Sequence, residues 1–202
     1  MFAVVESGSI TSMPKGNKGI QIGDIKHSAD IFTSKWTEAQ RNAIGVYTVE
    51  IDNTNLKDNK WYINTDITYA FGSGKVTGSY GTATARAHAD TLFTAQDETD
   101  GLGTEGELKA EGLKTKLIRN IKESAEIILN RTDWYVTRKA EKSTAIPSSI
   151  TTHRDAVRTK QASMETAITN AANTPALETL YTYTEQEDGS FTRPLGELPT
   201  LK

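Results

Sequence analysis

Cysteine is absent from the 202 residues of this chain, and the absence restricts the chemistry open to it. A chain without a thiol forms no disulfide, offers no thiolate ligand to a metal and has no cysteine nucleophile. Its fold must therefore be stabilised by packing, hydrogen bonds and contacts with partners.

Aromatic residues are also scarce, at 7% of the chain, whereas 36% of the residues are hydrophobic and 24% are charged. This composition is typical of a folded chain with one medium domain or two small ones, but it limits the size of the cores. We therefore expect the protein to gain stability by assembly, and a homo-oligomer is one expected form.

The chain has neither a strong charge of one sign nor a long hydrophobic run. With 23 basic and 26 acidic residues its net charge is −3 at pH 7, so no global field attracts nucleic acid or an anionic membrane. No window approaches the roughly 18 apolar residues of a membrane helix. The opening MFAVVESGSI lacks the features of a secretory signal, which predicts that the protein stays in the cytoplasm where it is made.

Catalytic signatures are missing as well. The segment FGSGKV (71–76) resembles the end of a phosphate loop, but Tyr69 stands where the first glycine belongs and Val76 replaces the magnesium-binding Ser or Thr. A hairpin turn is predicted there instead. The sequence has no nucleophile elbow, zinc-protease, kinase or dinucleotide motif. The three histidines, His27, His88 and His153, are far apart in the sequence. None has another histidine or a carboxylate three or four positions away on a clear helix face. We therefore expect that the protein is not an enzyme and that it has no catalytic residue and no cofactor.

The acidic segment QDETDGLGTEGE (96–107) partly fits a calcium loop, with Glu98, Asp100 and Glu107 as oxygen ligands around Gly101. Its first ligand position holds the neutral Gln96, and Gly103 stands where an apolar residue anchors such loops. A solvated acidic linker over 86–103 is the favoured interpretation, so no metal site is predicted. An enzyme that uses a divalent ion at 98–107 is the alternative.

Residues 1–85 have the pattern of a small antiparallel β domain with one short helix. The pairs Ser7-Gly8 and Ser73-Gly74 lie between β-type runs and predict hairpin turns. Thr37 is a suitable N-cap for a short helix that ends at Gly45, and the alternating VYTVEID that follows predicts a strand. The expected anchors of this domain are Trp36 and Trp61.

Helical periodicity begins after Thr104. Apolar residues from Ala110 to Ile128 recur every three or four positions and predict a helix of about seven turns. Pro147 marks the start of a second helix, in which an apolar residue recurs every seven positions from Ile150 to Ala171. The sequence thus predicts a helical hairpin over 104–180 and an extended C-terminal arm over 181–202, and the fold class is α+β.

The stretch between the two helices, NRTDWYVTRKAEKSTAIPSSITTHRDAVR (130–158), combines aromatic and basic residues. A stacking surface for single-stranded nucleic acid is one interpretation. Interspersed acidic residues favour the other, a corner braced by salt bridges with Trp134 as a wedge inside it. The corner residues proposed as structural or interaction sites are Trp134, Tyr135, Pro147, Arg154, Val157 and Arg158.

Residues 113–160 resemble the tail assembly chaperone family of tailed phages. The resemblance lies in the Leu117 to Leu129 helix, the Thr132-Asp133-Trp134 corner, Pro147, and Arg154 with Val157-Arg158. The opening MFAVVESGSI and the segment from Trp36 to Val49 are similar to small phage tail and tail-fibre-associated proteins.

The resemblance implies a structural component of a tailed-phage virion, in the tail or tail-fibre apparatus, that acts by assembly with other virion proteins. Its location is then the virion, after synthesis in the cytoplasm of the bacterial host. The alternatives are a non-virion tail assembly chaperone and an accessory protein of the capsid surface or neck.

Overall fold

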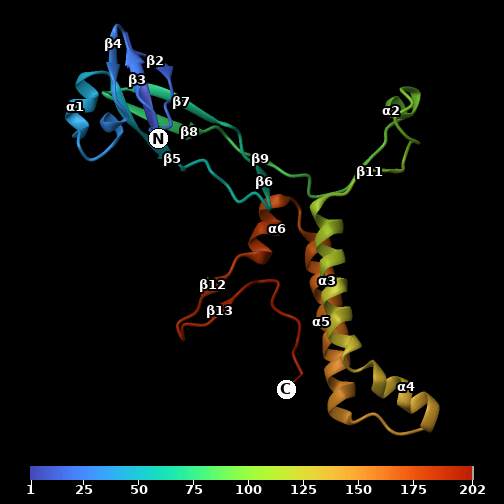
Figure 1. Cartoon of the computed structure of the whole chain (residues 1–202). Helices are drawn as coiled ribbons and strands as arrows, with labels where there is room; N and C mark the ends of the chain where they lie inside the picture. Colours follow the sequence, from blue (N-terminus) through green and yellow to red (C-terminus); the bar gives the residue numbers. More distant parts are fainter. Residues whose placement is uncertain (202) are drawn as a thin grey trace. The chain divides into compact units, whose positions relative to one another are not determined.

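The computed structural model describes residues 1–201 and has an α+β fold (Figure 1). The chain divides into two compact units, the first formed by Met1–Thr84 and the second by the residues from Ala85 onward. The first unit is built mainly of strands and the second mainly of helices.

The first unit contains a five-stranded sheet with the order β2-β1-β5-β8-β7, and contacts between β2 and β7 make it nearly closed and barrel-like. Short strands and helices complete the unit. Its elements are β1 (Phe2–Glu6), β2 (Ser9–Ser12), β3 (Ile20–Ile22), β4 (Ile25–His27), the 3₁₀ helix η1 (Ala29–Phe32), α1 (Glu38–Ala43), β5 (Val46–Asp52), β6 (Tyr62–Ile63), β7 (Ile67–Gly72) and β8 (Lys75–Tyr80), with β9 (Thr84–Ala85) at its end.

The sheet is mixed, and the prediction of an antiparallel sheet is wrong at one pairing. Strands β5 and β8 run parallel, with Val49 opposite Val76, whereas β1 pairs antiparallel with β2 and β5, and β7 antiparallel with β8. The long connection over residues 53–66 and the β7–β8 hairpin reverse the chain twice. For this reason β8 returns beside β5 in the same direction.

The predicted turns are confirmed. Ser7 and Gly8 have φ of 50° and 78°, and Ser73 and Gly74 have 52° and 75°, the positive values that tight hairpins need. The segment 71–76 is therefore a hairpin turn. The hydroxyl of Thr37 caps α1 in a capping box with Gln40, as the sequence predicts for this threonine.

Two small apolar clusters form the core of the first unit. One contains Ala3, Val5, Val49 and Val76, and the other contains Val4, Ile31 and Val46. Of the two expected anchors, Trp61 is buried with 3% of its surface exposed, and Trp36 packs partly buried against the second cluster.

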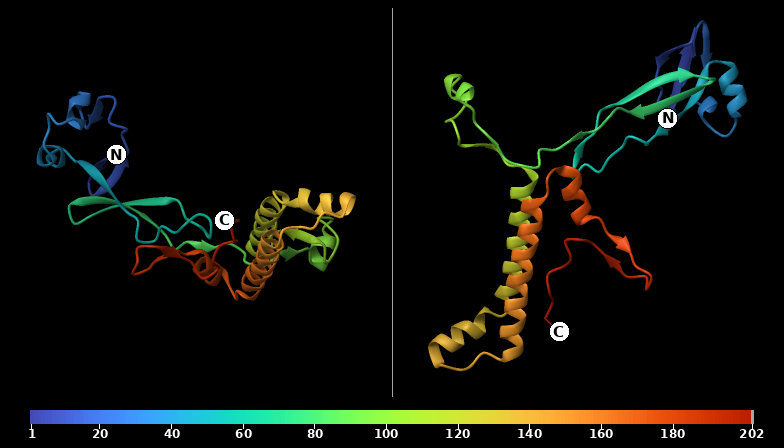
Figure 2. Two further views of the ribbon diagram at one scale, coloured as in Figure 1. Left: turned by 90° about the horizontal axis from the view of Figure 1, so that it is seen from below. Right: turned by 180° about the vertical axis from the view of Figure 1, so that it is seen from behind.

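The second unit is organised around two long helices, α3 (Leu113–Asn130) and α5 (Ser148–Asn170), which lie side by side (Figure 2). Their apolar rows are buried, as predicted, including Leu117 and Ala125 on α3 and Val157 and Met164 on α5. The remaining elements are β10 (Thr91–Leu92), α2 (Ala95–Thr99), β11 (Leu108–Ala110), α4 (Asp133–Lys142), α6 (Thr174–Tyr181), β12 (Thr184–Glu185) and β13 (Phe191–Thr192).

Three predictions for this unit need correction. The first long helix begins at Leu113, because residues 108–110 form β11. In place of an acidic linker, residues 91–110 form a β-hairpin that carries the capped helix α2. The C-terminal segment is not simply extended, since β12 and β13 pair antiparallel and Leu195 is buried. Within residues 1–201, no helix combines the length and hydropathy that crossing a membrane requires.

Candidate protein-interaction site

The corner between the two long helices is held by a single buried guanidinium. Nη1 of Arg154 lies 2.8 Å from the Leu129 carbonyl oxygen, 2.7 Å from Oγ1 of Thr132 and 2.7 Å from Oδ1 of Asp133. The Arg154 side chain is only 10% exposed, and Thr132 is buried. Arg154 therefore ties α5 to the end of α3 and the start of α4, which is the role of an internal brace.

The other predicted corner residues separate into inner and outer positions. Val157 is fully buried one turn beyond Arg154. Pro147 is the N-cap residue of α5, with φ −54° and ψ 138°. Arg158 is exposed and pairs at 3.3 Å with Asp155 on the same helix. Arg158 thus belongs to the surface, whereas Arg154 and Val157 belong to the interior.

The aromatic residues of the corner lie on the outside, on a region that we call the α4 tip (residues 131–142). The rings of Trp134 and Tyr135 stack with centroids 3.8 Å apart, and the guanidinium of Arg138 lies 4.7 Å and 5.2 Å from them. Trp134 is 52% exposed, and α4 buries no residue. The prediction that Trp134 fills the corner is wrong, because the Arg154 contacts already close it.

Unpaired positive charge surrounds these rings. Within residues 1–201, Arg131, Lys139 and Lys142 form no ion pair with a carboxylate. The neighbouring Val136 is 44% exposed, and Ile127 at the end of α3 is 60% exposed. The α4 tip therefore presents an apolar and aromatic surface with basic residues around it.

At the other end of α3, residues 91–110 form a second protrusion, which we call the hairpin lobe. Strands β10 and β11 pair antiparallel, with Leu92 opposite Leu108, and Thr94 caps α2 at the end of the hairpin. Every residue from Thr91 to Ala110 is at least partly exposed, and Leu92, Leu102 and Leu108 are each about half exposed or more.

The hairpin lobe carries five carboxylates and one lysine, and most of these carboxylates have no cationic partner. Asp97 forms an ion pair with Lys109. In the described part of the chain no basic side chain pairs with the others, which are Glu98, Asp100, Glu105 and Glu107. Asp100 accepts a hydrogen bond from Gln96, and no group of three or more ligands within residues 1–201 is arranged to hold a metal ion.

The base of the lobe is fastened to the first turn of α3. The carboxylate of Asp90 accepts hydrogen bonds from the Gly112 amide at 2.7 Å and from the Thr115 hydroxyl at 2.8 Å. These bonds lower the pKa of Asp90, the amide bond being the larger cause. The amide of Leu113 also donates to the Ala87 carbonyl. The lobe is therefore positioned by α3 although its outer part has no core.

The contacts of the Asp97 carboxylate predict that the hairpin lobe loses stability in acid. Hydrogen bonds from Lys109 and then from the Thr94 amide and hydroxyl lower the pKa of Asp97 from 3.8 to about 2. Because this pKa is lowered by folding, the stabilisation is complete above about pH 4 and is lost as the pH falls through about 2. We expect the protection of lobe amides, measured relative to the intrinsic exchange rate at each pH, to fall over that range, and D97N to remove the dependence while lowering protection at neutral pH. An unchanged acid profile in D97N would contradict this account.

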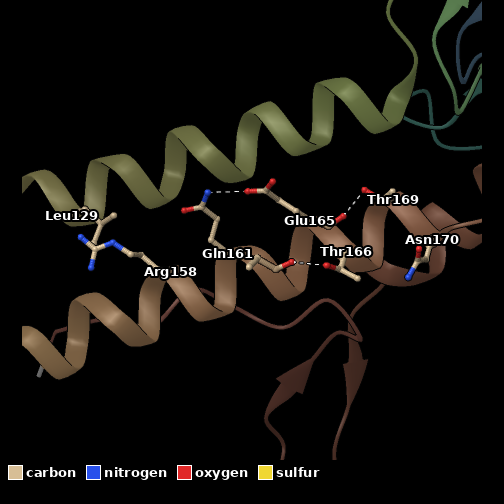
Figure 3. A pocket seen from close by; sticks show the side chains of 8 residues that line it. Leu129, Arg158, Gln161, Glu165, Thr166, Thr169 and Asn170 are labelled. Carbon is tan, nitrogen blue, oxygen red and sulfur yellow. Dashed lines mark hydrogen bonds between the residues drawn. The ribbon is translucent and has the colours of Figure 1, made fainter.

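A shallow groove of about 680 Å³ follows α5 beside the end of α3 (Figure 3). Its wall includes Leu129 from α3, and the rest comes from α5, with a Gln161–Glu165 hydrogen bond of 2.8 Å. Lys122 approaches Glu165 at 3.6 Å across the two helices. The groove is lined mainly by polar side chains, and it has no nucleophile paired with a base.

The C-terminal segment has a single buried side chain between residues 182 and 201. This side chain belongs to Leu195, whose amide donates to the Leu180 carbonyl oxygen at 3.0 Å. Arg193 and Tyr183 both reach the carboxylate of Glu197 nearby. The rest of the segment is partly or fully exposed, including Phe191 at 62%.

Comparisons with protein-family models, with curated proteins and with solved structures found no match to this chain.

Proposed function

We propose that this protein is a structural component of a tailed-phage virion, in the tail or tail-fibre apparatus, and that it acts by protein–protein assembly. The observation that carries the assembly role is the pair of protrusions without a core, the hairpin lobe and the α4 tip. Both expose large apolar side chains, such as Leu102 at 61% and Trp134 at 52%. Such surfaces are typical of binding sites, because burying them against a partner is favourable.

The exposed area of the chain supports the same proposal. The protein exposes 13101 Å². Two separate compact domains with the same total mass would expose about 11,000 Å². The difference means that this chain buries less surface per residue than compact domains of the same mass. Contacts with other molecules would bury part of the remaining surface and stabilise the protein further.

The assignment to a phage virion rests on the sequence resemblance of residues 113–160, and of the N-terminal segments, to phage tail proteins. The partners are then other virion proteins and further copies of this chain. The residues proposed for these contacts are the exposed Trp134 and Arg158 and the partly exposed Tyr135. Arg154 and Val157 would shape the corner from within, and the exposed Pro147 would do so as the residue at which α5 begins.

Mass spectrometry of purified particles tests this function. We expect the protein among the particle components, in a fixed ratio to tail proteins. Its absence from purified particles, with abundance in the lysate of infected cells, would overturn the proposal and favour the non-virion tail assembly chaperone. Electron microscopy of particles labelled on this protein separates the tail from the capsid surface and neck.

A further inference from the structure

The hairpin lobe and the α4 tip are opposite in charge and similar in apolar content. Glu98, Asp100, Glu105 and Glu107 on the lobe have no cationic partner within residues 1–201. On the tip the charged side chains without an ion pair in the described part of the chain are mostly positive, with Arg131, Arg138, Lys139 and Lys142 against the single carboxylate of Glu141. Each set accompanies exposed apolar side chains, which are leucines on the lobe and Trp134 with Val136 on the tip.

Neither protrusion has a core of its own that would stabilise it while these apolar side chains are exposed. A two-stranded hairpin is marginally stable in water unless a further strand, helix or other surface covers it. The lobe buries no residue between Thr91 and Ala110, and α4 buries none either. Both are nevertheless fixed to the long helices, the lobe by Asp90 at the start of α3 and the tip by Arg154 at the corner. They are therefore positioned elements that lack a covering surface.

We propose that the α4 tip of one copy docks onto the hairpin lobe of the next copy. The unpaired lysines and arginines of the tip meet the unpaired carboxylates of the lobe, and Trp134, stacked on Tyr135, covers the exposed leucines. The inference rests on the proposed assembly function and deepens it by naming a second copy of this chain as the partner.

The geometry of this contact decides the kind of oligomer. The two surfaces are different and lie at opposite ends of α3, so a copy that uses its tip still has its lobe free. Contacts of this kind repeat from copy to copy and produce a ring if the rotation closes, or a filament if it does not. A two-fold dimer, in which the same surface is used by both copies, is not the expected product.

Charge reversal on each side, followed by mixing, tests the contact. The tip variant carries K139E and K142E, and the lobe variant carries E105K and E107K; these four side chains are exposed. Each variant alone places like charges on both surfaces, so we expect its dissociation constant to rise by about tenfold or more. In the mixture both kinds of contact join opposite charges again, and assembly should return as an alternating oligomer.

Sedimentation velocity of the full chain at low and high salt gives the measurement, and far-UV circular dichroism shows whether each variant is folded. Two control variants make the same charge changes on exposed residues elsewhere: K15E with K18E, and E185K with E187K. We expect both controls to assemble as the wild type does, and added salt to weaken assembly of the wild type.

Three results would overturn the proposal: a wild-type chain that stays monomeric, a folded single variant that assembles normally, or a mixture that does not recover. None of these results bears on whether the protein is present in particles. Mass spectrometry of particles therefore tests the proposed function separately from this contact.

Discussion

Replacement of Arg154 by methionine is expected to lower the free energy of unfolding of the second unit by about 2–4 kcal/mol. The change keeps most of the side-chain volume but removes the guanidinium that contacts Leu129, Thr132 and Asp133. Thr132 is buried, so its hydroxyl loses a partner that water does not easily replace. Urea unfolding, followed by circular dichroism of the helices, measures the change.

Arg158→Met is the matched control. It removes the same group one turn away, where the guanidinium is about half exposed and pairs only with Asp155 at 3.3 Å. Exposed pairs of this kind contribute about 0–1 kcal/mol, so R158M should unfold close to the wild type. Equal effects of R154M and R158M would show that the corner is not braced by Arg154.

The brace also explains an irregularity of the sequence. Arginine at position 154 interrupts the apolar row that runs along α5 through Ile150 and Val157. A row of leucines would pack two straight helices, whereas a guanidinium also satisfies oxygens where α3 ends and α4 begins. The sequence alone indicates that Arg154 is a structural group at a corner, but it does not indicate which oxygens it contacts, because these become neighbours only in the fold.

Local signals in the sequence were sufficient for much of the fold. The turns at Ser7-Gly8 and Ser73-Gly74 require positive φ, and the capping threonine Thr37 provides a hydrogen bond within its own helix. The apolar periods of α3 and α5 likewise depend on residues that are close in the chain. These features were predictable because each is determined by neighbours within a few positions.

The features that were missed depend on distant residues or on weak local signals. The parallel pairing of β5 with β8 joins Val49 to Val76 across a long connection, and no local pattern specifies its direction. The hairpin lobe has strands of two and three residues, too short for an alternating pattern to be recognised. Its one usable signal was Thr94 followed by Asp97, which form the capping box of α2.

Exposure of Trp134 could not be predicted either. Burial is the usual expectation for a tryptophan between two helices. Here the corner is closed by smaller groups, Thr132 and the stem of Arg154, and Trp134 instead stacks on Tyr135 at the surface. The difference matters for function, because an exposed aromatic pair is available to a partner and a buried one is not.

Replacement of Leu195 by alanine is expected to release the C-terminal segment from the rest of the second unit. Leu195 is 2% exposed and is the only buried residue between 182 and 201. Truncating a buried leucine costs about 2–5 kcal/mol, and even 2 kcal/mol is a shift of roughly thirtyfold in the population of the released form. The Leu195 amide, which donates to the Leu180 carbonyl oxygen, should lose its protection from hydrogen exchange to a similar degree.

Phe191→Ala is the control for this release, since it removes a larger side chain from the same segment at a position that is 62% exposed. We expect F191A to leave protection of the Leu195 amide within about 0.5 kcal/mol of the wild type. Cleavage after Glu197 by a glutamyl endopeptidase should follow the same order, rapid in L195A and slow in F191A and the wild type. Slow cleavage and full protection in L195A would mean that another contact, such as that of Arg193 with the Tyr181 ring of α6, holds the segment without the leucine. Exposure of the Leu195 side chain would then be the single step that frees this segment from the second unit. The freed segment would correspond to the extended C-terminal arm that the sequence predicts.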